Sequence, residues 1–340
     1  PGVRGAVWVA VRVPDDCISA HANQSRIHQF DMNDKNNCMY SPDVISFARE
    51  KGYFDGVNKD FSFANAYAPL DFSARRYCEA RVWSYFNMFT ARGNEFLPYI
   101  LGDTDTPMPL FVKPDRKISV QDVKNAMRDH YEGTPLDISK DFGAGPYHTP
   151  YRLSPLSFKV GDKEYFNERP ISTQQSGFVF VAQMRSTLPD AIGGVLWFGT
   201  DDANMTVFTP VYCCTDKVPV CYSRVDGADY ITFSWNSSFW IFNWVSNMVY
   251  PRYDLMIGDV RATQNELETT FNEAQEGIES AAAKLLEKDP AKAKAFLTNY
   301  TNMTAQSAFD TWKRLGEFII VKYNDGVVRK MKDGKFERNA

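Results

Sequence analysis

Two segments of the chain carry the side chains best suited to catalysis, and the first surrounds Asn23. Asn23 ends a segment in which apolar and polar residues alternate from Cys17 onward, and it shares a face with Ser19 and His21. A side-chain amide at a strand end can donate a hydrogen bond to a developing oxyanion, and losing one such donor typically raises the barrier by about 2.7–4 kcal/mol. The alternative is a turn asparagine that bonds its own backbone. Asn23 is therefore a candidate catalytic residue, with His21 as a candidate substrate contact.

The second segment is helical in pattern and holds Arg75, Arg76 and Arg81 among aromatic residues. Neighbouring residues point in different directions on a helix, so Arg75 and Arg76 do not share a face. Arg81 directly precedes Val82-Trp83, whose packing would hold the guanidinium fork toward a carboxylate. The alternative is a surface arginine whose stem lies over the apolar core.

Further candidates for substrate binding occur later in the chain. Tyr147, His148 and Arg152 lie in the Gly- and Pro-rich segment 141–155, and binding residues favour loops that a scaffold holds in place. A loop that merely covers a sheet would carry the same Gly and Pro residues. Arg185 is a candidate partner for a substrate carboxylate or, equally, a member of a structural ion pair.

Several kinds of chemistry are excluded. The motifs G-x-S-x-G, G-x-G-x-x-G and H-E-x-x-H and a Walker loop do not occur. The four histidines are widely separated, so no metal site is predicted. The six cysteines are too sparse for a disulfide scaffold, and the compartment stays open. The acidic pair Asp201-Asp202 is expected to be a solvated turn.

Composition limits the partners. The 38 Lys and Arg residues against 42 Asp and Glu residues give a net charge of -4, and no basic cluster stands out. Phosphate binding needs a concentrated positive field, so neither nucleic acid nor an acidic membrane surface is a predicted partner. No apolar run approaches the ~20 residues that span a bilayer. Neither a nucleic-acid-binding protein nor a membrane protein is predicted.

The elements that must position the candidate residues form an α+β pattern with an antiparallel sheet, because strands and helices come in groups without regular βαβ alternation. Expected strands cover 6–13, 17–23, 177–184, 194–198 and 207–213, and expected helices cover 41–52, 73–91, 119–131, 267–285 and 305–315. A hairpin is expected over 318–330, with its turn at Asn324-Asp325-Gly326. We expect one main domain over 1–260 and, over 261–340, a helical extension ending in a β-hairpin and packed on it.

The candidate segments, together with several others, resemble the dipeptidase A family of cysteine peptidases, which are N-terminal-nucleophile hydrolases. The resemblance runs in order to about Val260. It rests on Trp8-Val-Ala-Val-Arg-Val-Pro14, Ser19-Ala-His-Ala-Asn23-Gln-Ser-Arg26, Glu79-Ala-Arg81-Val-Trp83, Gly145-Pro-Tyr-His-Thr-Pro-Tyr-Arg152, Gln183-Met-Arg185-Ser-Thr-Leu-Pro189, Gly194-Val-Leu-Trp197 and Ser238-Phe-Trp240-Ile-Phe-Asn243-Trp-Val-Ser-Asn247.

The resemblance implies an αββα sandwich of antiparallel sheets with flanking helices. It implies that a cysteine at the mature N-terminus is the nucleophile and that its own α-amino group, with a pKa of about 7.7–8.0, is the base. By local matching, Asn23 completes the oxyanion hole and Arg81 lies near the nucleophile, with Arg76 as the alternative arginine. Neither a metal nor an organic cofactor is required.

The chain departs from the family at its beginning. It opens at Pro1 just before an expected strand, and none of its cysteines is N-terminal. We therefore expect the C-terminal part of a dipeptidase, incomplete at the N-terminus, with no nucleophile of its own and inactive alone. Its expected partners are a missing upstream segment and a dipeptide substrate, and the apolar C-terminal helices are compatible with a homo-oligomer.

Two other functions remain open. One is a non-catalytic peptide- or glycan-binding protein of the same fold, which would lack a cysteine at the mature start of the full product. The other is an amidase that acts on N-acyl compounds, which a panel of dipeptides and acyl-amino acids would separate from a dipeptidase.

Overall fold

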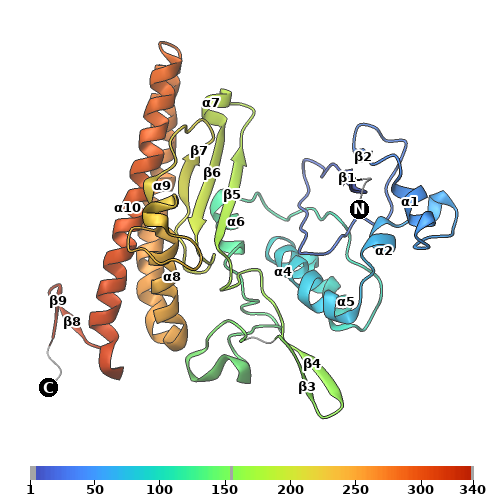
Figure 1. The fold of residues 1–340 in the computed structure, drawn as a ribbon, viewed down its shortest axis with the longest axis horizontal. Coiled ribbons are helices and arrows are strands. Elements are labelled where there is room, and N and C mark those ends of the chain that lie inside the picture. The colour runs from blue at the N-terminus through green and yellow to red at the C-terminus, as the bar shows by residue number, and fades with distance from the viewer. Residues whose placement is uncertain (1–4, 154–155, 338–340) are drawn as a thin grey trace. The chain divides into compact units, whose positions relative to one another are not determined.

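A computed structural model of the protein describes residues 5–153 and 156–337 (Figure 1). The chain forms two compact units: the first comprises Pro1–Ser119 and Arg152–Ile171, and the second comprises Val120–Tyr151 and Ser172–Ala340. Pro1 and Pro155, which entered the sequence predictions, lie outside the described residues. The predicted division at residue 260 stays a prediction.

The first unit is built from short elements. Its two sheets are antiparallel strand pairs, β1 with β2 and β3 with β4. The strands are β1 (Val9–Val11), β2 (Cys38–Tyr40), β3 (Ser157–Val160) and β4 (Lys163–Phe166), and the helices are α1 (Val44–Glu50), α2 (Phe63–Tyr67), α3 (Phe72–Ala74), α4 (Ala80–Phe89) and α5 (Leu97–Leu101).

The helix expected over 73–91 is present and carries the arginines. It consists of α3, a π-helical turn over Arg75–Glu79, and α4. The Asp71 carboxylate caps its start by accepting a hydrogen bond from the Ala74 amide at 2.7 Å. Trp83 of α4 is fully buried and its indole Nε1 donates to the Gly93 carbonyl at 2.9 Å. The apolar face of α4 thus fixes the direction of its polar side.

Two strand predictions in this unit need correction. The strand expected over 6–13 shrinks to the three residues of β1, and the alternating segment 17–23 is no strand. Only Ile18 makes an isolated bridge, to Val112. Alternation produces a strand only where a neighbouring strand completes the ladder, and beyond Ile18 no such ladder forms in the described part of this segment.

The second unit holds a three-stranded antiparallel sheet in the order β5-β6-β7, formed by the three strands that the sequence predicts in this region. Its strands are β5 (Phe178–Met184), β6 (Gly194–Thr200) and β7 (Thr209–Tyr212), and a short pair β8 (Met331–Lys332) and β9 (Lys335–Phe336) lies near the C-terminus. Its helices are α6 (Val120–Ala126), α7 (Asp190–Gly193), α8 (Ser238–Val249), α9 (Tyr253–Leu286) and α10 (Pro290–Tyr323). The long helices α9 and α10 lie side by side (Figure 1).

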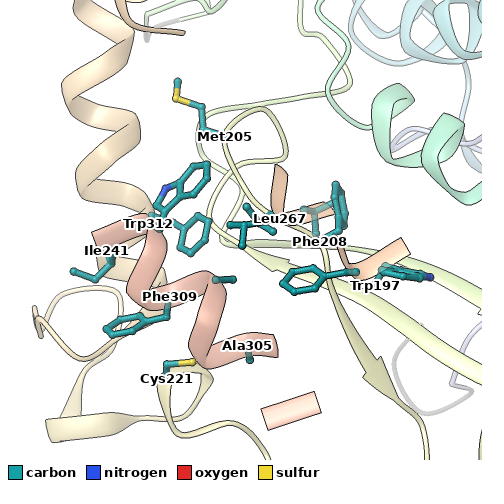
Figure 2. Close-up of a cluster of buried hydrophobic side chains, with 14 of the residues drawn as sticks. Trp197, Met205, Phe208, Cys221, Ile241, Leu267, Ala305, Phe309 and Trp312 are labelled. Carbon is teal, nitrogen blue, oxygen red and sulfur yellow. The ribbon is translucent and has the colours of Figure 1, made fainter. Parts of the chain in front are cut away.

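One face of this sheet forms the core. Val181 and Trp197 are paired across β5 and β6 and are buried in one cluster with residues of α8, α9 and α10. Figure 2 shows part of that cluster, including Trp312 of α10. The Trp312 ring stacks on the ring of Phe242 of α8, with the ring centres 4.7 Å apart. The opposite face of the sheet is also apolar, but it is exposed: Phe178 and Met184 of β5 are 61% and 62% exposed.

The predicted C-terminal hairpin is wrong in position. Residues 318–323 continue α10, because Ile319 and Tyr323 fall four and eight residues after Leu315 and are buried on the same helical face. Asn324-Asp325-Gly326 ends the helix instead of turning a hairpin, and the hairpin that does form pairs β8 with β9. The helix expected over 119–131 is also shorter, ending at Ala126.

Candidate active site

Asn23 and Arg81, which lie 58 positions apart in the sequence, meet in the first unit. Arg81 Nη2 donates a hydrogen bond to Asn23 Oδ1 at 2.8 Å. The arginine is held in turn by its Nε, which donates to the Tyr77 carbonyl one helical turn earlier at 2.7 Å. The two residues singled out separately in the sequence therefore form one polar contact.

This contact orients the Asn23 amide. A guanidinium has donors only, so the atom facing it must be the amide oxygen, and the Asn23 Nδ2 group points elsewhere. Nδ2 has no hydrogen-bond partner within the described residues, and the side chain is exposed. The backbone of Asn23 has a φ of +58°, a region that asparagine tolerates better than most residues. The arrangement leaves the Asn23 Nδ2 group as an exposed donor.

His21 lies two residues before Asn23 and is exposed at the surface. Partial burial of its ring lowers its pKa, and the nearby charge of Arg26 lowers it further, whereas Glu79 opposes the shift. The neutral imidazole is therefore favoured near neutral pH. Its assignment to substrate binding stays a prediction.

A buried ion pair that sequence reasoning missed joins the same two segments. Arg26 Nε lies 3.0 Å from Glu79 Oε1, and both residues are 4% exposed. Arg26 follows Asn23 by three residues and Glu79 precedes Arg81 by two, so both belong to the motifs that carry the family resemblance. Membership of these motifs is the one feature of the sequence that points to Arg26 and Glu79.

Arg76, the alternative active-site arginine, has a different partner. Its Nη2 lies 2.8 Å from Glu168 Oε1, and Arg152 Nη2 lies 3.9 Å from the other oxygen of the same carboxylate. Arg76 and Arg152 thus gather around Glu168, while Arg81 is the arginine that contacts Asn23. Their roles in binding or catalysis stay predictions.

The remaining candidates lie in the second unit. Tyr147 ends a 3-10 turn and is followed by His148, which has a φ of +53° and an Nδ1 atom 3.0 Å from the Ser139 carbonyl. Arg185 makes a two-pronged ion pair with Glu279, with both N–O distances at 2.7 Å. The ion pair that the sequence left open for Arg185 is therefore present.

The expectation that Asp201 and Asp202 are solvated is wrong. They are 2% and 1% exposed. Asp201 accepts hydrogen bonds from Asn243 Nδ2 at 2.9 Å and Ser246 Oγ at 2.8 Å. Burial, followed by the neighbouring Asp202 charge, raises the pKa of Asp201 to about 7. Asp202 accepts a hydrogen bond from the Tyr250 hydroxyl at 3.0 Å. The partners of both carboxylates lie far along the chain, so the local Asp-Asp pattern does not reveal their burial.

Among residues 5–153 and 156–337, no three His, Cys, Asp or Glu side chains lie close enough together to hold a metal ion. None of the helices in that part of the chain has the length and apolarity needed to cross a bilayer.

Comparison with known proteins supports the resemblance. A model of peptidase family C69 matches residues 2–266. A probable dipeptidase from Salmonella dublin is 34% identical over 208 residues, which are 61% of this chain and 42% of that protein. Probable dipeptidase B from Lactococcus lactis subsp. lactis is 25% identical over 331 residues, 94% of this chain and 61% of that protein. Dipeptidase A from Lactobacillus helveticus is 24% identical over 241 residues, which are 70% of this chain and 44% of that protein. The chain thus spans about half the length of these relatives.

Proposed function

The chain belongs to peptidase family C69, the dipeptidase A-type cysteine peptidases, and from that premise we propose that it is the C-terminal part of an enzyme that hydrolyses the amide bond of dipeptides. The observation that carries the proposal is the Asn23–Arg81 contact, which leaves Asn23 Nδ2 to donate to a substrate oxygen. The family match and the printed names of the relatives give the reaction class, a peptidase.

In this proposal a cysteine thiolate attacks the carbonyl carbon of the dipeptide, and the carbonyl oxygen becomes an oxyanion that Asn23 Nδ2 stabilises. Arg81 holds the amide in the required orientation and adds a positive charge near the developing negative one. The α-amino group of the cysteine takes the thiol proton and gives it to the departing nitrogen as the tetrahedral intermediate collapses, so the amine leaves and a thioester remains. Water then hydrolyses the thioester, with the α-amine of the nucleophilic cysteine as the base.

The nucleophile in the proposal lies outside this sequence. Burial raises the pKa of Cys17, Cys38, Cys214 and Cys221, in the case of Cys221 to about 11. A raised pKa disfavours the reactive thiolate. Cys78, which follows shortly after Arg76, is itself buried within the helix. Cys213 is exposed. The raised pKa values of the other four thiols support a nucleophile in an upstream segment.

We propose in addition that the second unit provides one sheet and one helical layer of an αββα sandwich. The sheet β5-β6-β7 carries helices on one face. Its other face exposes Phe178, Phe180 and Met184, at 61%, 48% and 62% of their surface. A sheet with two apolar faces needs a layer on each. A second sheet stacked on this face would complete the sandwich.

The test is Asn23→Ala in the complete enzyme, assayed with a panel of dipeptides and N-acyl amino acids. We expect kcat/KM for dipeptides to fall by about 10²–10³-fold while the melting temperature is retained, because one oxyanion donor is lost. Asn36→Ala is the matched control, since Asn36 is an exposed asparagine outside the site. Unchanged dipeptide turnover by a folded Asn23→Ala enzyme contradicts the proposal. So does an unmutated enzyme that hydrolyses acyl-amino acids but no dipeptides.

A further inference from the structure

The Asn23 segment is fixed in place although it has no strand ladder. Arg26, three residues after Asn23, is 4% exposed and uses all three of its guanidinium nitrogens. Nη1 donates to the Ala20 carbonyl at 3.2 Å, and Nη2 donates to the Pro109 carbonyl at 3.0 Å. These bonds tie both ends of the segment 20–26 to each other and to a distant part of the same unit.

The third nitrogen ties the segment to the helix that carries Arg81. Arg26 Nε lies 3.0 and 3.1 Å from the two carboxylate oxygens of Glu79, which is also 4% exposed. The guanidinium carbon lies 5.5 Å from the centre of the Phe86 ring on α4. The segment around Asn23 and the helix around Arg81 are therefore joined twice, once at the exposed Asn23–Arg81 contact and once through a buried charge pair.

The helix departs from α-helical geometry where it supplies this pair. Glu79 is the last residue of the π-helical turn Arg75–Glu79, and α4 begins at the next residue. A π turn inserts one residue into a helix and rotates the side chains on either side of it relative to each other, and such turns are frequent at functional sites. Stability alone does not call for a buried ion pair, because well-packed apolar residues are often as stable.

From these observations we infer that Arg26, held by Glu79, is a positioning residue for the oxyanion donor. It sets the position of Asn23 so that Oδ1 meets Arg81 and Nδ2 faces the reacting carbonyl. The inference rests on the proposed function and adds a residue to its site. It differs from a merely structural role in one respect: Arg26 acts on the reaction through Asn23.

A double-mutant cycle in the complete enzyme tests this. Arg26→Lys keeps the charge and loses the guanidinium fork, so it cannot keep all the hydrogen bonds that Arg26 makes to Glu79 and to the carbonyls of Ala20, Met108 and Pro109. We expect kcat to fall by at least ~10-fold with little change in KM, because small displacements of a catalytic group are costly. In an Asn23→Ala background the same change should lower kcat by less than about 2-fold, since the donor that it positions is already gone. Arg92→Lys, an exposed arginine on the same unit, is the control and should leave kcat unchanged.

The outcomes separate the two ideas. Equal fold-losses from Arg26→Lys in both backgrounds, or no loss in either, overturn the positioning role while leaving Asn23 as the oxyanion donor. An Asn23→Ala enzyme with unchanged kcat overturns the proposed site, and the positioning role with it. Where Arg26→Lys does not fold, Glu79→Gln takes its place in the cycle, because it keeps the side-chain shape and an acceptor oxygen and removes only the charge.

Discussion

A buried ion pair in the second unit makes the strongest stability prediction. Glu268 of α9 is 2% exposed and accepts four hydrogen bonds. Oε1 accepts from Arg128 Nη2 at 2.5 Å and from the Phe208 amide at 2.9 Å, and Oε2 accepts from Arg128 Nη1 at 3.2 Å and Gln121 Nε2 at 3.1 Å. This one carboxylate joins α9 to α6, to the arginine that follows α6, and to the approach to β7.

Glu268→Gln turns one acceptor oxygen into an NH₂ group and leaves Arg128, which is 8% exposed, as an uncompensated buried charge. Breaking a buried pair in this way costs about 3–5 kcal/mol. The double variant Glu268→Leu with Arg128→Met removes both charges and should cost less than the sum of its single variants by about 0.5–3 kcal/mol. It will not restore full stability, because Arg128 also donates to the Ala203 and Thr206 carbonyls.

Urea unfolding followed by far-UV circular dichroism measures these free energies of unfolding. Lys292→Met is the control, since Lys292 pairs with Asp289 while its side chain is 75% exposed, and an exposed pair contributes at most about 1 kcal/mol. A loss below about 1 kcal/mol in Glu268→Gln, or strict additivity in the double variant, would refute the reasoning that the buried charge pair dominates.

Two further predictions concern packing in the second unit. Lys124 is fully buried with Nζ 3.5 Å from the centre of the Trp197 ring, and burial lowers its pKa to about 7. The unfolded chain keeps this proton up to about pH 10.5, so between pH 7 and 10.5 the free energy of unfolding should rise by up to about 1.4 kcal/mol per pH unit. Urea titrations at pH 7 and 9 should show this rise in the parent protein and not in Lys124→Met. The same change in the free energy of unfolding with pH in both proteins contradicts the prediction. Gly316→Ala places a methyl group 2.3 Å from the Trp244 ring and should lower the free energy of unfolding by about 1–3 kcal/mol. The control Gly277→Ala, in open space on α9, should raise the melting temperature. A calorimetric scan that finds Gly316→Ala as stable as the parent contradicts the packing.

The elements that sequence predicts well are those whose local pattern agrees with their tertiary surroundings. β5 and β6 have apolar runs between Gly and Pro signals, and the long apolar face of α9 steps by three and four residues. The segment 17–23 has the alternation of a strand but lacks a ladder of partners beyond Ile18. The turn signal at Asn324-Asp325-Gly326 is correct as a turn, yet the packing of Ile319 and Tyr323 makes it a helix end.

The candidate site shows the same limit. The residue types and the family resemblance select Asn23 and Arg81 one at a time, but no spacing in the sequence indicates that they touch. The buried Arg26–Glu79 pair depends on how two distant segments approach each other, so composition and periodicity do not reveal it. The buried pair Asp201-Asp202 was missed because its donors, Asn243 and Ser246, come from a helix some 40 residues later.

We propose above that this chain supplies the oxyanion donor of a dipeptidase whose nucleophile lies upstream of it. The most direct measurement is to inactivate the enzyme, as its native cell makes it, with a dipeptide-derived thiol-reactive compound and to map the modified residue by mass spectrometry. We predict stoichiometric modification of a cysteine at the mature N-terminus, outside these 340 residues, with complete loss of dipeptide hydrolysis. Loss of activity that tracks modification of one of the six cysteines within this chain would contradict the claim.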